Sequence, residues 1–180
     1  NTNSGFERNS LDEGIADYFA ASYSKRLSNY NTNWVYNWDG HNEFWNGRAV
    51  NSTKHYPEDL SPTSYYKNSE LWSSTLMNIH DELGFAYTDS LVLNTLYFFT
   101  QNMTQPQAAK ALLLSDTLLS NGKNFCVIYK HLYERGYVPF VQNSCGISAI
   151  HEVKNIAAEL LSTPNGFVIR ANNDDLQIES

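Results

Sequence analysis

Apolar residues recur at helical spacing in six stretches of the chain, and each stretch predicts a helix with one buried stripe. The stretches are Leu11–Asn29, Asn68–Leu83, Thr88–Met103, Gln105–Ser120, Asn124–Arg135 and Ile147–Leu161. The connections after Tyr66 are short, as is typical of antiparallel neighbouring helices. We therefore predict a mainly α fold, an antiparallel helical bundle-like lobe of about six helices with little β structure.

Residues that stop or start helices mark several of these boundaries. Gly84 and Gly136 follow two of the stretches, and Pro106 lies in the first turn of another, where proline is tolerated. In the stretch Thr88–Met103, the large apolar residues are expected in the core; they are Leu91, Leu93, Leu96, Tyr97 and Phe99.

The segment Tyr30–Val50 lacks helical spacing and is rich in Trp, Asn and Gly. Trp34, Tyr36 and Trp38 alternate with polar residues, which indicates a short strand or an extended, aromatic-rich loop. We assign residues 1–162 to the helical lobe. The polar, acidic residues 163–180 are expected to be a tail or a linker.

Composition excludes two classes of partner. The chain has 180 residues, 42% of them hydrophobic, which suffices for a core, and its net charge is −7. An acidic chain does not suit nucleic acid, which needs a basic surface. A membrane-spanning helix needs about 18 consecutive apolar residues, and the sequence contains no such run.

Several features suit an exported protein, located outside the cell, on its surface or in a periplasm. Asn, Ser, Thr and Tyr are abundant and Lys is scarce. Cys126 and Cys145 are too far apart in sequence for a short metal-binding pair, so they form either one disulfide or two buried thiols. The chain begins on polar residues without an initiator Met, so we expect a piece of a longer protein.

Glu13 and Asp17 lie four residues apart in the first predicted helix, so both carboxylates project from one strip of its surface. Two such acids can fix a cation. They can equally form an acidic first turn that suits the helix dipole. Spacing alone favours the second interpretation.

The sequence EGIADYFA, residues 13–20, resembles the E-G-x-x-D-(Y/F)-(F/I)-(A/G) segment of thermolysin-like and fungalysin-like zinc metallopeptidases. The resemblance implies that Glu13 is the third zinc ligand and that Asp17 orients a histidine ligand. These roles agree with zinc chemistry, in which three protein ligands leave one position for water and a second carboxylate holds a ligating imidazole.

Two further segments extend this resemblance. Residues 54–57, KHYP, are similar to the R-x-Y-P stretch whose arginine approaches the substrate, which implies that role for Lys54, with Arg48 as a rival. Residues 70–72, ELW, resemble the G-E-x-W helix, and the position of that family's oxyanion-stabilising histidine is Tyr66 here. A phenol can donate a hydrogen bond to an oxyanion, or the ring can simply be a packed aromatic.

The sequence contains no H-E-x-x-H. The resemblance therefore implies the C-terminal part of a secreted zinc endopeptidase, with zinc in the intact protein and a peptide or protein substrate. It also implies a missing N-terminal half, so we expect this chain alone to be metal-free and inactive. The alternatives are a degenerate peptidase homologue, marked by Tyr66, or a non-catalytic helical interaction domain that binds through the aromatic residues of 34–45.

Overall fold

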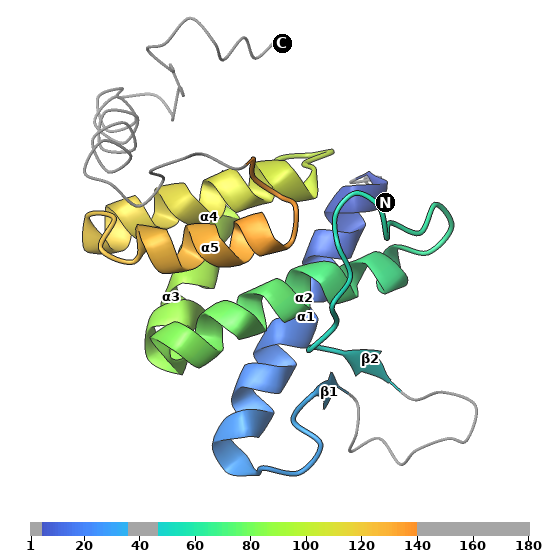
Figure 1. Ribbon diagram of the computed structural model, residues 1–180, viewed down its shortest axis with the longest axis horizontal. Helices are drawn as coiled ribbons and strands as arrows, with labels where there is room; N and C mark the ends of the chain where they lie inside the picture. Colours follow the sequence, from blue (N-terminus) through green and yellow to red (C-terminus); the bar gives the residue numbers. More distant parts are fainter. Residues whose placement is uncertain (1–4, 36–46, 140–180) are drawn as a thin grey trace, which may run out of the picture.

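A computed structural model describes residues 5–35 and 47–139 and is mainly helical, as the sequence predicts (Figure 1). The helices are α1 (Phe6–Leu27), α2 (Tyr65–Leu83), α3 (Phe85–Thr95), α4 (Gln105–Ser120) and α5 (Phe125–Glu134), with a 3₁₀ turn η1 (Leu96–Phe98) and the strands β1 (Trp34–Val35) and β2 (Arg48–Ala49). The predicted helix Ile147–Leu161 and the tail 163–180 lie outside the described residues. No helix within the described part is long and apolar enough to cross a membrane.

Helices α1 and α2 cross near their middles and share the largest interface between elements (Figure 1). Gly14 of α1 allows the close approach, because a Cβ atom there would lie 2.9 Å from the carbonyl oxygen of Ser69 and 3.0 Å from the Cβ of Trp72. Buried side chains from both helices fill the interface; they include Leu11, Tyr18, Leu71, Trp72, Leu76 and Ile79. Glu13 therefore lies beside the crossing.

A second layer is formed by α4 and α5, which lie side by side (Figure 1). Thr104 and Gln107 form a capping box at the start of α4, and Pro106 occupies its first turn as predicted. The side chain of Gln105 is buried and donates to Ser10 Oγ at 3.0 Å, which joins α4 to α1. It also accepts from the hydroxyl of Tyr137 at 2.7 Å, so the chain after α5 is held against the same core.

The strands β1 and β2 form a short antiparallel pair in which Trp34 faces Ala49 and Val35 faces Arg48. Gly47 precedes β2 with φ of +81°, and a Cβ there would lie 2.4 Å from the carbonyl oxygen of Val35. Glycine is therefore required at this approach. The pair fixes the backbone of Arg48 beside α1 and α2. Tyr36 and Trp38 lie outside the described residues.

The core prediction for residues 88–103 is wrong in part. The α-helix begins at Phe85 and ends at Thr95, and its buried stripe consists of Thr88, Leu91, Val92 and Thr95. Two threonines thus belong to a buried stripe for which the sequence analysis named only large apolar residues. The hydroxyl of Thr95 donates to the carbonyl oxygen of Leu91 at 2.8 Å, which lets it lie in the core. As a result Leu93, Leu96 and Tyr97 are exposed, and Phe99 packs only at the edge of the core.

Two leucines of α3 provide a matched test of this stripe. Leu91 is 0% exposed and Leu93 is 52% exposed. We expect Leu91→Ala to lower the free energy of unfolding by about 2–5 kcal/mol, because it leaves a cavity. Leu93→Ala is expected to cost less than about 1 kcal/mol. Urea denaturation of both variants measures the difference, and equal costs would contradict the assignment.

Candidate functional site

An open concavity of about 710 Å³ lies between α1, β2 and the start of α2. Three of the residues singled out from separate segments of the sequence line it, namely Glu13, Arg48 and Tyr66. The remaining lining residues are Gly47, Ser64, Lys67 and Glu70. Asp17 and Lys54 do not line the concavity, but each is bonded to a residue that does. The fold thus gathers these sequence-predicted residues into one region.

Asp17 is fully buried and paired with Arg48. Arg48 Nε donates to Asp17 Oδ2 at 2.6 Å, and Arg48 Nη2 donates to Asp17 Oδ1 at 2.6 Å. Ser69 Oγ of α2 lies 3.2 Å from Asp17 Oδ2 and shares its one proton between this carboxylate and the carbonyl oxygen of Tyr66, which is 2.7 Å away. A bidentate guanidinium with a further hydrogen bond compensates for the cost of removing a carboxylate from water.

Glu13 lies one turn before Asp17 and has a different environment. Its side chain is 33% exposed, and its Oε2 accepts one hydrogen bond from Arg48 Nη2 at 3.2 Å. The carboxylate therefore faces the concavity and is held less tightly than that of Asp17.

Tyr66 lies in the first turn of α2, at the rim of the concavity, where it is half exposed. The ring centroids of Tyr65 and Tyr66 are 4.3 Å apart. The guanidinium carbon of Arg48 lies 5.3 Å from the ring centroid of Tyr66. The pKa of Tyr65 is raised, first by a hydrogen bond with Tyr66, and also by desolvation and by the charges of Tyr66 and Glu13. The two phenols and the guanidinium form one edge of the site.

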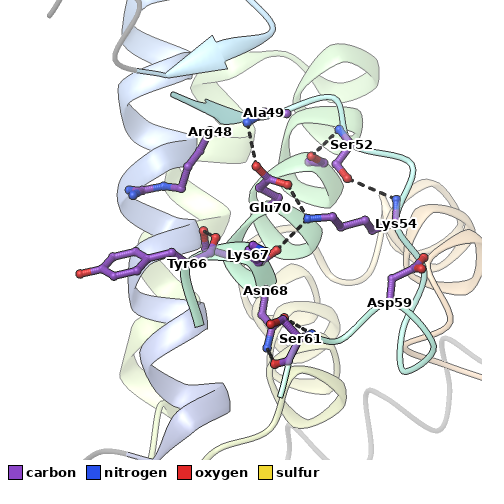
Figure 2. A network of polar contacts seen from close by, with 12 residues as sticks. Arg48, Ala49, Ser52, Lys54, Asp59, Ser61, Tyr66, Lys67, Asn68 and Glu70 are labelled. Carbon is purple, nitrogen blue, oxygen red and sulfur yellow. Dashed lines mark hydrogen bonds and ion pairs between the residues drawn. The ribbon is translucent and has the colours of Figure 1, made fainter. Parts of the chain in front are cut away.

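Glu70 also lines the concavity, and it is bonded to Lys54, which does not line it (Figure 2). Lys54 Nζ lies 2.5 Å from Glu70 Oε2 and donates to the carbonyl oxygen of Lys67 at 3.0 Å. Glu70 Oε1 accepts from the backbone N–H of Ala49 at 3.2 Å, so one side chain of α2 holds both β2 and the segment after it. Lys54 and Arg48 are the two cations predicted to approach the substrate. Arg48 lines the concavity, whereas Lys54 does not line it and binds the lining residue Glu70.

The sequence analysis missed this anchoring role of Glu70 and the contact of Ser69 with Asp17. Ala49 and Glu70 are 21 residues apart, and Asp17 and Ser69 are 52 apart. No local pattern links residues at such separations.

Cys126 lies half-buried on α5, whereas Cys145 lies outside the described residues. The prediction of either one disulfide or two buried thiols is therefore not tested.

The site provides one predicted metal ligand, and the described residues do not form a complete metal site. Among residues 5–35 and 47–139, no group of three or more His, Cys, Asp or Glu side chains is arranged to hold a metal ion. Glu13 is the one predicted ligand, and Arg48 lies beside it. The resemblance implies that Asp17 binds a histidine. In this structure its oxygens accept hydrogen bonds from Arg48 and Ser69.

Three comparisons with known proteins, against family models, curated proteins and solved structures, find no match for this chain. The relation to thermolysin-like and fungalysin-like peptidases therefore stays a prediction from short motifs.

The ion pair between Asp17 and Arg48 is buried, whereas that between Lys25 and Asp81 is at the surface. Removing Arg48 should therefore lower the free energy of unfolding more than removing Lys25. Arg48→Met leaves the carboxylate of Asp17 buried without its partner, and we expect it to lower the free energy of unfolding by about 3–5 kcal/mol. Lys25→Met removes an exposed partner of Asp81 and is expected to cost less than about 1 kcal/mol.

Chemical denaturation at neutral pH compares the two variants. Adding Asp17→Asn to Arg48→Met is expected to recover part of the loss, because the uncompensated charge is removed. A cost for Arg48→Met as small as that for Lys25→Met would show that the pair does not stabilise the fold.

Proposed function

We propose that this chain is the helical lobe of a secreted zinc-dependent endopeptidase and that Glu13 is the third zinc ligand. One observation carries the proposal. Glu13, Arg48 and Tyr66 were selected from three separate segments, and all of them line a single concavity. Glu13 is the partly exposed acid there, so its carboxylate is accessible to a metal ion.

The other residues of the site take the roles that the resemblance implies for them. Asp17 is the outer carboxylate of this proposal; because both of its oxygens accept hydrogen bonds from Arg48 in this chain, a ligating imidazole would have to share them. Tyr66 presents its hydroxyl at the rim, where it can donate to an oxyanion. Arg48 lines the concavity and is the cation that contacts a substrate carbonyl, in preference to Lys54. Zinc, when bound, polarises the scissile carbonyl and lowers the pKa of its water.

In this proposal the other zinc ligands belong to polypeptide that is not part of this chain. The sequence contains no H-E-x-x-H, and one carboxylate does not retain catalytic zinc. The N-terminal half of the catalytic domain is thus the partner that completes the metal site over Glu13.

The assignment of Glu13 is tested by zinc titration of the full-length protein. We expect Glu13→Gln to weaken zinc binding by at least about 100-fold, since even outer carboxylates contribute 10–100-fold. Glu70→Gln is the matched control, because Glu70 lines the same concavity and is engaged with Lys54 and Ala49. Equal zinc affinity in the wild type and Glu13→Gln would rule out the ligand role.

The chain of 180 residues alone is expected to be inactive. Purified chain should not hydrolyse casein, and added zinc should leave its Tm unchanged, because only one ligand is offered. Hydrolysis that EDTA abolishes would refute this expectation.

The other candidates are a non-catalytic helical interaction domain and a degenerate peptidase homologue. Two observations favour the interaction domain. Arg48 contacts both Glu13 and Asp17, so each acid has a cationic partner without a metal. Apolar side chains near the end of α3 are exposed, and Tyr97 is 86% exposed, as on protein-binding surfaces. An H-E-x-x-H motif encoded within a few dozen residues before Asn1 would favour the peptidase, and its absence there would favour the other two candidates.

A further inference from the structure

Helix α1 carries two apolar stripes, one buried and one facing outward. The inner stripe lies in the core and includes Leu11, Ile15 and Tyr18. The outer stripe follows the same steps of four and three residues; it consists of Ala16, Ala20, Tyr23 and Leu27. Ala16 is exposed and Ala20 is half-buried. Tyr23 and Leu27 are 59% and 69% exposed. This spacing lines up the outer side chains as in the seam between two paired helices.

Aromatic side chains widen the outer stripe at its end. The guanidinium carbon of Arg26 lies 5.5 Å from the ring centroid of Tyr23 and 4.9 Å from that of Phe85, which is 45% exposed. Figure 1 shows the last turns of α1 extending beyond α2 and away from α4 and α5. Exposed aromatic rings around an arginine are typical of protein-binding surfaces.

The outer stripe is complementary in size to a second copy of itself that runs antiparallel. Its small residues, Ala16 and Ala20, lie towards the middle of α1, and its large residues, Tyr23 and Leu27, lie towards the end. In a parallel pair, large side chains face large ones and alanines face alanines. In an antiparallel pair, the alanines of each copy leave room for the large side chains of the other.

The charges of α1 favour the same orientation. Residues 6–17 contain four acids and one arginine, whereas residues 18–27 contain two basic residues and no acid. The side chains of Asp12 and Arg26 remain 46% and 39% exposed in their ion pairs within the chain. An antiparallel pair sets the acidic half of each helix beside the basic half of the other, and a parallel pair sets like charges together.

We propose that the outer stripe of α1 is a homodimer interface, in which α1 packs antiparallel against α1 of a second copy of this chain. A two-fold axis at the middle of the stripe sets Ala16 against Leu27 of the second copy, and Ala20 against its Tyr23. Each contact then occurs twice, as in any two-fold symmetric interface. The inference does not depend on the proposed function, because the stripe and the concavity share no residue.

Sedimentation velocity of the 180-residue chain, over a micromolar concentration series, tests the interface. We expect the wild type to form a dimer whose fraction rises with concentration. Leu27→Asp is expected to raise the dimer dissociation constant at least about tenfold, because it buries a carboxylate without a partner. Leu93→Asp is the matched control, since Leu93 is 52% exposed on α3 outside the stripe, and it should dimerise as the wild type does. A monomeric wild type, or equal dissociation constants for the two variants, overturns the proposal.

A mixing experiment tests the orientation. Ala16→Lys and Leu27→Asp each place one charge at an exposed end of the stripe, so each variant alone is expected to dimerise poorly. An equimolar mixture is expected to recover a dimer, because antiparallel packing sets the new ammonium of one chain against the new carboxylate of the other. In a parallel pair the two new charges never meet. A mixture that dimerises no better than its components would overturn the antiparallel arrangement.

Discussion

The site depends on one buried ion pair, between Asp17 of α1 and Arg48 of β2. Asp17 has no contact with solvent, so its charge must be compensated inside the protein. The guanidinium does this with two short hydrogen bonds, and Ser69 of α2 adds a third. Three elements that are distant in the sequence are thereby held at one point. The position of the concavity and the orientation of Glu13 follow from this arrangement.

The crossing of α1 and α2 explains why a charge can be buried there. Gly14 brings the two helices so close that Ser69 reaches Asp17 from the facing helix. Glu70, the next residue of α2, accepts a hydrogen bond from the backbone N–H of Ala49 in β2. Two adjacent residues of α2 thus contact Asp17 of α1 and the strand β2, which carries Arg48. These contacts hold the elements of the candidate site together.

Within the described residues the sequence predicted where the helices lie, because apolar periodicity and helix-ending residues such as Gly84 are local signals. It failed where the buried stripe uses threonine, as at Thr95, whose hydroxyl donates to the backbone carbonyl of Leu91 and so can lie in the core. In the site, the four-residue spacing placed Glu13 and Asp17 on one strip of α1. The pairing of Asp17 with Arg48 spans 31 residues and a strand pair, so no pattern in the sequence could indicate it.

We propose Glu13 as the point at which this lobe contacts a metal ion. Anomalous diffraction at the zinc absorption edge, from crystals of the zinc-loaded full-length protein, examines this most directly. The account predicts a zinc peak about 2.0–2.2 Å from a carboxylate oxygen of Glu13. A peak elsewhere, with Glu13 still bonded to Arg48, would contradict it.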